Sequence, residues 1–241
     1  VTGGASGIGR ATVLKMAAAG AEVFTGDMDE AGNAETAEMA RAAGGSATAV
    51  TLDISDRDSV AGFASTTTGD GARTVDIIVN IAGWDRIQPF LDATPEFMDK
   101  ILDINLKGPM NVVKAFLPDM VAANAGKIVS ISSDAGRVGS MGETIYAGAK
   151  GGVIAFTKKA GRELGPFGVT VNAIAPNMTL TERIRPRWDQ RSPDDQVAMV
   201  EGIPLRRMAE AVDQAKVICF LASGDADYVT GQTIDVSGGL V

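Results

Sequence analysis

A tyrosine and a lysine stand four residues apart in the segment YAGAK, at Tyr146 and Lys150, among glycines and alanines. Residues at this spacing share one face of a helix, so both side chains can point to the same side. A free phenol has a pKa of about 10 and is a poor base at neutral pH. A lysine cation about 4 Å away is expected to lower that pKa by about three units, which needs roughly 4 kcal/mol. The pair therefore predicts proton transfer to or from an alcohol or ketone oxygen.

Ser133 lies 13 residues before Tyr146, directly after an apolar run, and its hydroxyl is suited to hold the same oxygen. Each residue also has a simpler interpretation when taken alone: a packed tyrosine whose hydroxyl reaches solvent, and a lysine on a solvated helix face. The combination with the motifs described below favours the catalytic interpretation.

The elements that must position these side chains follow an alternating pattern. Strands are predicted at 22–25, 48–52, 76–80, 127–132, 170–175 and 233–236, and helices at 7–19, 30–43, 95–123, 146–164 and 211–222. This alternation predicts an α/β fold, with a three-layer, doubly wound parallel sheet of the Rossmann type. Ligands of such sheets gather at the carboxyl ends of the strands, which is where Ser133 is expected.

No linker or internal repeat divides the chain, so we expect residues 1–241 to form a single domain that both binds a dinucleotide and carries the catalytic group. The charged segment 179–207, which contains three prolines, is expected to form a lid over the substrate. Only Val1 and Thr2 precede the first glycine of the motif. Because a central strand normally leads into that turn, about ten residues ending in an apolar run are expected to precede Val1 in the natural chain.

Composition excludes several classes of site and partner. The chain contains no histidine, so Ser-His-Asp and Cys-His catalysis are excluded, and no metal site is predicted. Its single cysteine, Cys219, lies in an apolar run typical of a buried residue, and this cysteine usage is typical of a cytoplasmic protein. The net charge of −8 argues against nucleic acid or an anionic membrane as a partner, and no apolar stretch is long enough to span a membrane.

The segment TGGASGIG places Gly3, Gly7 and Gly9 where a strand should turn into a helix. Glycines there allow a tight turn and a close approach to a pyrophosphate at the helix N-terminus. A glycine-rich turn alone is equally typical of an ordinary loop.

Acidic residues end the next two predicted strands. Asp27 is placed to accept hydrogen bonds from the adenosine ribose and to repel a 2′-phosphate, and neither Ser6 nor Met28 offers a positive charge there, so NAD is predicted in preference to NADP. Asp53 is placed to meet the adenine ring. Each has an alternative interpretation as a helix cap, with Asp27 or Asp29 opening the following helix.

With these motifs the chain resembles the short-chain dehydrogenase/reductase family, of the non-extended type, over its whole length. The motifs occur in order as TGGASGIG, NIAG at 80–83, Asn105 in INLKG, Ser133 in ISSD, Tyr146 and Lys150 in YAGAK, and PNMTLT at 176–181. The resemblance implies a catalytic tetrad of Asn105, Ser133, Tyr146 and Lys150, in which Asn105 holds a water that links Lys150 to solvent. It also implies a homotetramer. The residues expected to contact the dinucleotide are Gly3, Ser6, Gly7, Ile8, Gly9, Asp27, Met28, Asp53, Ile54, Asn80, Ala82, Gly83, Tyr146, Lys150, Pro176, Thr179 and Thr181.

Two positions depart from the family pattern. Ile81 replaces the second asparagine of the Asn-Asn-Ala-Gly motif, and Asn177 replaces the glycine that follows Pro176. Asparagine tolerates positive φ better than most residues, so the turn at Asn177 is expected to persist with some strain.

The substrate must be inferred from residues near the tetrad. The segments GWDRIQPF, SDAGRVGSMGE and SGGL resemble one branch, the 2-hydroxycyclohexanecarboxyl-CoA dehydrogenases, which implies a secondary alcohol β to a thioester. The expected substrate contacts are Trp84, Ser133, Asp134 and Arg137, although Trp84 is equally typical of a core aromatic. The lid carries six arginines suited to the phosphates of coenzyme A, or alternatively to surface salt bridges: Arg183, Arg185, Arg187, Arg191, Arg206 and Arg207. The alternatives are a 3-oxoacyl reductase, a sugar or polyol dehydrogenase, and a regulator that binds the dinucleotide without chemistry.

Overall fold

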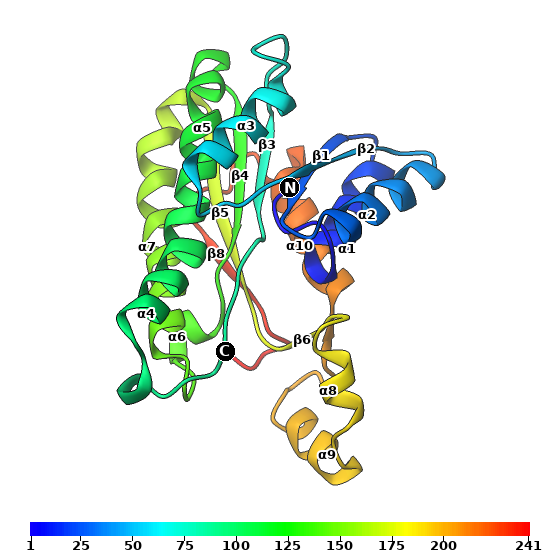
Figure 1. The fold of residues 1–241 in the computed structure, drawn as a ribbon, viewed down its shortest axis with the longest axis vertical. Helices are drawn as coiled ribbons and strands as arrows, with labels where there is room; N and C mark the ends of the chain where they lie inside the picture. Colours follow the sequence, from blue (N-terminus) through cyan, green and yellow to red (C-terminus); the bar gives the residue numbers. More distant parts are fainter.

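The computed structural model describes residues 1–241, in which helices cover both faces of a parallel sheet (Figure 1). The strands are β1 (Glu22–Asp27), β2 (Ser46–Thr51), β3 (Ile77–Asn80), β4 (Gly126–Ile131), β5 (Val169–Pro176), β6 (Thr179–Leu180), β7 (Ala209–Glu210) and β8 (Thr233–Val236). The helices are α1 (Gly7–Ala18), α2 (Glu30–Ala42), α3 (Arg57–Thr68), α4 (Pro95–Leu102), α5 (Gly108–Ala123), α6 (Ala135–Val138), α7 (Thr144–Leu164), α8 (Arg185–Asp189), α9 (Pro193–Glu201) and α10 (Ala211–Ala222).

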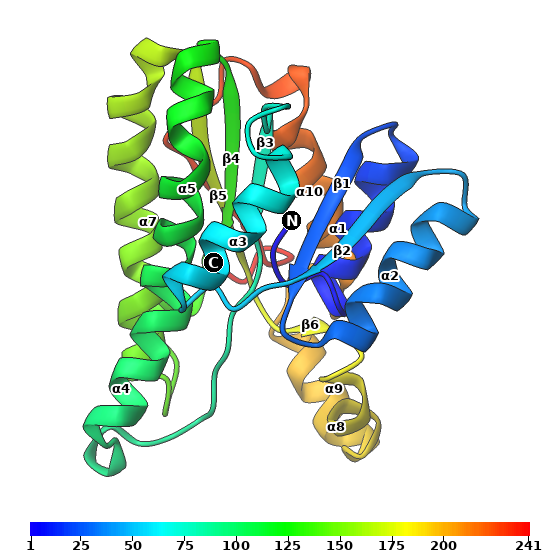
Figure 2. The same ribbon diagram turned by 45° about the horizontal axis from the view of Figure 1, so that its top comes forward.

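The three layers are held by two separate apolar cores. Helices α1, α2 and α10 pack on one face of the sheet through a cluster that includes Val13, Val129 and Ile218. Helices α3, α5 and α7 pack on the other face through a cluster that includes Phe63 and Phe116 (Figures 1 and 2). Strands β4 and β5 contribute to both clusters, because a strand between two helical layers is apolar on both sides. The predicted three-layer, doubly wound fold is confirmed.

The sheet consists of two hydrogen-bonded parts that meet at Thr2. One part contains β1 and β2, and the other has the strand order β3-β4-β5-β8, with every pair parallel. Thr2 bridges Gly26 of β1 and Asn80 at the end of β3, and its amide donates to the carbonyl of Val79 at 2.9 Å. Beyond this bridge, toward the amino ends of β1 and β3, lies a cavity of about 330 Å³ lined by residues that include Val1, Phe24 and Ile77.

The predicted helix over 95–123 is interrupted. Helix α4 ends at Leu102, a π-helical turn occupies Asp103–Lys107, and α5 begins at Gly108. The cause is Pro109, which lacks the N–H that an α-helix would direct at the carbonyl of Asn105. The amide of Gly108 instead bonds to the carbonyl of Asp103, five residues back. The other predicted strands and helices are confirmed to within a few residues at their ends.

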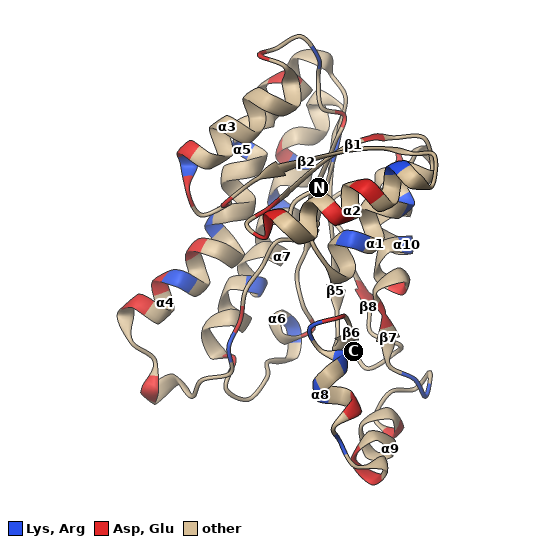
Figure 3. Ribbon diagram, turned by 45° about the vertical axis from the view of Figure 1, so that its right-hand side comes forward, with Lys and Arg blue, Asp and Glu red and all other residues tan.

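The segment 179–207 extends from the carboxyl end of β5 and carries α8 and α9 (Figure 1). A small apolar cluster joins Leu180 and Ile203 of this segment to Met208, which directly follows it. Neither α8 nor α9 contains a fully buried residue. The ribbon in Figure 3 marks both acidic and basic residues along this segment. None of the helices in the structure combines the length and the apolar character needed to cross a membrane.

Candidate active site

Lys150 is buried on α7, and its position fixes the geometry of the site. The side chain is 2% exposed, and its Nζ donates to the carbonyl oxygen of Ile131 at the end of β4, at 2.9 Å. The hydroxyl of Ser132 in turn donates to the carbonyl of Lys150 at 2.9 Å, which ties α7 to the same strand end. A Cβ on Gly136 would come within 2.8 Å of the amide nitrogen of Gly151, so α6 and α7 approach more closely than larger residues permit.

Asn105 lies in the π-helical turn and is fully buried. Its Nδ2 donates to the carbonyls of Trp84 at 2.6 Å and Ile101 at 3.0 Å, and its Oδ1 accepts from the amide of Trp84 at 3.3 Å. These contacts hold the loop that follows β3. A Cβ on Gly83 would lie 2.9 Å from Asn105 Oδ1 and 3.7 Å from Lys150 Nζ, so the loop, the π turn and α7 meet at this glycine.

Ser133 completes the group from the end of β4. Its hydroxyl donates to Asp134 Oδ1 and accepts from the amide of Ala135, each at 3.1 Å. The Ser133 side chain also lies close enough to Tyr146 to lower the pKa of the phenol in part. The structure thus brings all four predicted catalytic residues together: Asn105, Ser133, Tyr146 and Lys150.

The electrostatic prediction for Tyr146, that the Lys150 cation lowers the pKa of the phenol by about three units, is wrong. Burial, followed by the negative charges of Asp85 and Glu143, raises the pKa of Tyr146 above its usual value. The Lys150 ammonium lies 5.5 Å from the centre of the tyrosine ring, and burial lowers its own pKa to about 8. The prediction omitted both burial and the carboxylates contributed by neighbouring loops.

Three carboxylates raise the pKa of Tyr146, and none of them was predicted to do so. Asp85 and Glu143 were not predicted as site residues, and Asp134 was predicted only as a substrate contact. Burial raises the pKa of Asp134 and of Glu143, and the charge of Asp85 raises that of Glu143 further. Their loops are joined by the amide of Gln88, which donates to the carbonyl of Gly142 at 2.8 Å. The only signal in the sequence is that Asp85 follows the NIAG motif by two residues.

The glycine turn before α1 has the features of an anion site. A Cβ on Gly9 would lie 1.7 Å from the carbonyl oxygen of Gly3, so no other residue fits without moving the turn. Ser6 caps α1 with extended backbone, and its side chain bonds to none of the first amides of the helix. The first turn of α1 contains no acidic residue. The first amides of α1, which the side chain of Ser6 leaves unbonded, suit a phosphate group.

Asp27 lies beside this turn, and its carboxylate accepts from the amides of Ala5 and Asp29, each at 3.0 Å. The cap of α2 is Asp29, which accepts from the amide of Gly32 at 3.0 Å, so the alternative interpretation of Asp27 as that cap is wrong. Asp53 accepts from the amide and hydroxyl of Ser55, which orders its own loop, and the N-cap of α3 is Asp56.

The other predicted dinucleotide contacts lie at the carboxyl ends of the strands and in the turns that follow them. Two side-chain oxygens in this region are buried and find no hydrogen-bond partner within the chain. One is Oδ1 of Asn80, a predicted contact, and the other is Oδ1 of Asn177, which follows the predicted contact Pro176. The backbone of Asn177 does not have positive φ, so the strain expected there is absent. The unpaired buried acceptors and the crowded glycines together suit a dinucleotide. The remaining predicted contacts in this region are Gly3, Gly7, Ile8, Met28, Ile54, Ala82, Gly83, Pro176, Thr179 and Thr181.

Among the predicted substrate contacts, Trp84 and Arg137 are engaged by the protein itself. The Trp84 ring packs edge-on against Phe97, and the Lys100 ammonium lies 4.1 Å from the centre of the indole ring. Arg137 pairs with Asp235 at 2.7 Å and donates to the carbonyl of Thr233, so its guanidinium is directed to β8. No group of three or more potential metal-binding side chains occurs in the structure.

Comparisons with known proteins agree with this geometry. A family model described as "Enoyl-(Acyl carrier protein) reductase" matches residues 3–241. The chain is 36% identical to the 3-oxoacyl-[acyl-carrier-protein] reductase FabG of Thermotoga maritima, over all of this chain and 96% of that one. It is 35% identical to the mouse (3R)-3-hydroxyacyl-CoA dehydrogenase, over all of this chain and 94% of that one.

A crystal structure of a 3-oxoacyl-[acyl-carrier protein] reductase from Brucella melitensis superposes with a TM-score of 0.91 at 33% identity, over 99% of this chain and 89% of that one. The fold, the grouped serine, tyrosine and lysine, and these relatives lead to one conclusion. The chain is an oxidoreductase that interconverts hydroxyl and ketone groups, and it belongs to the short-chain dehydrogenase/reductase family.

Proposed function

We propose that the chain is an NAD-dependent dehydrogenase that interconverts a β-hydroxyacyl thioester and the corresponding β-oxoacyl thioester. The observation that carries the proposal is the convergence of Ser133, Tyr146 and Lys150 at the end of β4, with Asn105 and Gly83 beside them. In the oxidising direction Tyr146 accepts the hydroxyl proton while Ser133 holds the oxygen. A nicotinamide dinucleotide, held at the glycine turn, would supply the acceptor for the hydride that leaves the same carbon.

Because the pKa of Tyr146 is raised, proton transfer at neutral pH requires additional positive charge near the phenol. At pH 7 Lys150, with a pKa of about 8, is mostly protonated and is the cation nearest the phenol. The three carboxylates oppose it, so a second positive charge near the phenol is needed to bring its pKa toward neutrality. Oxidised nicotinamide carries such a charge. We therefore expect Tyr146 to become an effective base only when the dinucleotide is bound.

Asp27 supports NAD as the preferred dinucleotide. Its carboxylate lies beside the glycine turn and forms no ion pair, so a 2′-phosphate placed there would meet an uncompensated negative charge. The nearest basic side chain of the turn, Arg10, is already bonded to the carbonyl of Ala5 and to the carboxylate of Glu35. The relatives named above as 3-oxoacyl-[acyl-carrier-protein] reductases make an NADPH-dependent reductase the alternative.

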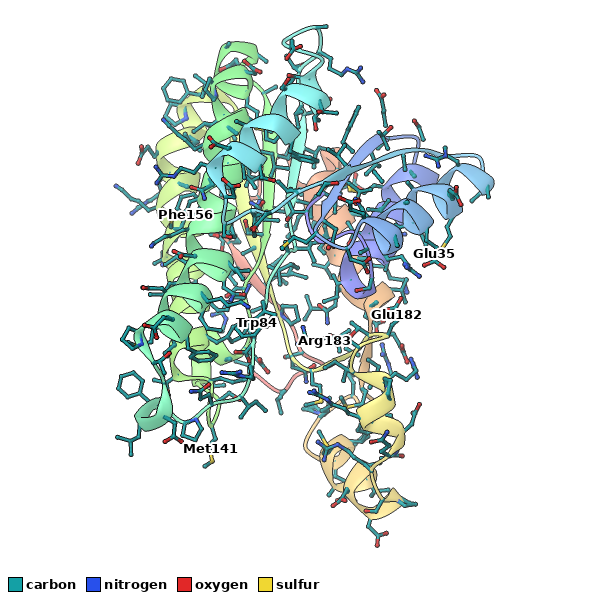
Figure 4. All side chains as sticks on the ribbon, viewed as in Figure 1. Glu35, Trp84, Met141, Phe156, Glu182 and Arg183 are labelled. Atoms are coloured by element: carbon teal, nitrogen blue, oxygen red, sulfur yellow. The ribbon has the colours of Figure 1, made fainter.

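The thioester substrate is supported by the relatives and by the surface near the tetrad. Two relatives carry names that specify acyl groups on a carrier protein or on coenzyme A. The loops that flank Ser133 and Tyr146 carry exposed apolar side chains suited to an acyl group or ring rather than to a sugar: Ile87, Phe90, Leu91, Val138 and Met141. Of these, Met141 is marked in Figure 4, at the tip of its loop.

Turnover with paired substrates and dinucleotides tests the proposal. We expect 3-hydroxybutyryl-CoA or 2-hydroxycyclohexanecarboxyl-CoA with NAD⁺ to give kcat/KM values roughly tenfold or more above those with NADP⁺, and far above those with a polyol. Asp27→Ala should relax the preference for NAD⁺, whereas Asp29→Ala, which removes only the cap of α2, should retain it. A wild-type preference for NADP⁺, or for sorbitol over the thioesters, would contradict the proposal.

We also propose a cytoplasmic homotetramer. The outer face of α7 supports this assembly because Gly148 and Ala155 leave room for a second helix to approach, and Phe156 lies at the same edge of the molecule (Figure 4). Light scattering measures the assembly directly.

A further inference from the structure

Residues Thr181, Glu182 and Arg183, here called the 181–183 strap, contact both sides of the site. Thr181 Cγ2 would lie 2.8 Å from a Cβ on Gly7, so it packs directly on the glycine turn. Glu182 Oε2 accepts from the amide of Gly7 at 2.8 Å. Arg183 donates from Nη2 to the carbonyl of Asp85 at 3.3 Å. The strap therefore joins the N-terminus of α1 to the loop that follows β3 (Figure 4).

The Glu182 carboxylate occupies the position of an anion at α1. Gly7 is the first residue of that helix, where the unpaired amides and the helix dipole favour a negative charge. The cap residue Ser6 forms no side-chain hydrogen bond there, and no residue of the first turn is acidic. The charge comes instead from a residue 175 positions away in the sequence. Arg10 lies on the other side of the carboxylate, with Nη1 3.9 Å from Glu182 Oε1.

Burial does not hold Glu182 in this position. Its side chain is 55% exposed, and its contacts are one hydrogen bond and one long ion pair. An exposed pair of this kind contributes little to stability, so the carboxylate can leave at small cost. The amide that it occupies belongs to the turn whose crowded glycines suit a pyrophosphate.

We propose that Glu182 takes the place of a dinucleotide phosphate in the free protein, and that dinucleotide binding displaces it and releases the 181–183 strap. The inference rests on the proposed function to the extent that it requires a dinucleotide at the glycine turn. Glu182 then sets the affinity for the dinucleotide, because each phosphate must compete with a carboxylate that belongs to the chain. Release of Glu182 also frees Arg183 from Asp85, next to Tyr146, so that cofactor binding and the arrangement of the segment 179–207 are coupled.

Binding measurements on the purified full chain test the inference without turnover. The ligands are ADP-ribose and NADH, which carry the pyrophosphate, and adenosine, which does not, each followed by calorimetry at constant ionic strength. Glu182→Gln removes the charge at the helix N-terminus with almost no change in shape. The matched control is Glu201→Gln, which removes the same charge from an exposed position at the end of α9 in the same segment.

We expect Glu182→Gln to lower the Kd for ADP-ribose and NADH roughly threefold to tenfold, in line with the effect of a charge at a helix N-terminus. The Kd for adenosine should stay unchanged in the same variant, and Glu201→Gln should leave all three values unchanged. An unchanged or higher Kd for ADP-ribose in Glu182→Gln overturns the inference, as does an equal effect of Glu201→Gln. If wild type binds neither ADP-ribose nor NADH, the proposed function is wrong as well. If wild type binds both and Glu182→Gln has no effect, only the inference about Glu182 is wrong.

Discussion

The wall of the site formed by β4, the π turn and α7 differs in construction from the segment 179–207 that faces it. In the wall the polar groups are buried and bonded: Asn105, Ser132 and Lys150 are at most 2% exposed, and each bonds to a backbone carbonyl. In the segment 179–207 neither helix has a fully buried residue, and the charged side chains lie in solvent. The reacting groups are thus held in place before a ligand arrives.

This difference indicates two roles: the wall carries out the reaction, and the segment 179–207 affects which ligand binds and how tightly. A buried lysine is unfavourable in itself, as its pKa of about 8 shows, and it is held by its hydrogen bond to the carbonyl of Ile131 and by the packing of α7 on the sheet. Substitutions in the wall should therefore change rate constants strongly. Substitutions in the exposed segment should change affinity weakly, because exposed charges are screened by water and salt.

The largest effect is expected for Tyr146→Phe, which removes the hydroxyl and leaves the ring that packs near Ile101 and Ala149. Loss of the proton-transferring group should lower kcat about 10²- to 10⁴-fold. The Kd for NADH should remain within about twofold of wild type, because the packing of α7 is unchanged. Stopped-flow absorbance of NADH and calorimetry give the two values.

Tyr228→Phe is the matched control, since Tyr228 is the only other tyrosine of the chain and is fully exposed. It should retain the wild-type rate. If Tyr146→Phe kept more than a tenth of the wild-type kcat, the assignment of proton transfer to Tyr146 would be wrong.

A smaller effect is expected for Asp85→Asn. The charge of Asp85 raises the pKa of Tyr146 and also that of Lys150, so its removal lowers both. For alcohol oxidation the rate rises as the phenol loses its proton, so the rising limb of the pH–rate profile should move to lower pH. The loss of the Lys150 charge should move in the same direction. We expect a shift of about 0.5 to 1 pH unit from a charge at this range.

The pH dependence of kcat/KM between pH 5 and 10 provides the measurement. Asp92→Asn is the control, because Asp92 is an exposed acid farther along the same segment and does not contribute to the pKa of Tyr146. If the profile of Asp85→Asn coincided with that of wild type, Asp85 would have no influence on the phenol during turnover, and this prediction would be wrong.

The parts of the site that could be predicted from the sequence are those fixed by local spacing. Tyr146 and Lys150 share a helix face, Ser133 and Asp27 lie where strands end, and Gly9 is required by a contact within its own turn. The carboxylates of Asp85 and Glu143 could not be predicted, because their position depends on the pairing of two loops that are distant in the sequence. Glu182 was missed for the same reason, since its partner lies at the other end of the chain.

In the fold as well, elements with a clear local pattern were predicted, and an element that depends on tertiary packing was not. Helix α3 was missed because its sequence RDSVAGFASTTT contains a glycine and many serines and threonines, which are weak helix formers. Tertiary packing stabilises it instead, through Val60 and through Phe63, whose ring meets that of Phe116 edge-on at 6.1 Å.

The smallest effect is expected for the arginines of the exposed segment. Four of the six are engaged within the chain: Arg183 with the carbonyl of Asp85, Arg185 with Glu210, Arg206 with the carbonyl of Glu201, and Arg207 with Asp213. The alternative interpretation of these arginines as surface salt bridges therefore applies to two of them, Arg185 and Arg207. Arg187 and Arg191 form no side-chain hydrogen bond or ion pair, which leaves them available to the phosphates of a coenzyme A substrate.

Arg187→Gln and Arg191→Gln should each raise the KM for 3-hydroxybutyryl-CoA about two- to fivefold, the range of an exposed ion pair, and leave kcat unchanged. The N-acetylcysteamine thioester of the same acyl group lacks the phosphates, so its KM should not change. Arg162→Gln, at the far end of α7, provides the control for general charge effects. A matching rise in KM for both thioesters would place the two arginines outside the phosphate contacts. A fall in kcat would instead mean that the exposed segment takes part in positioning the reacting groups, and the separation between chemistry and selection would not hold.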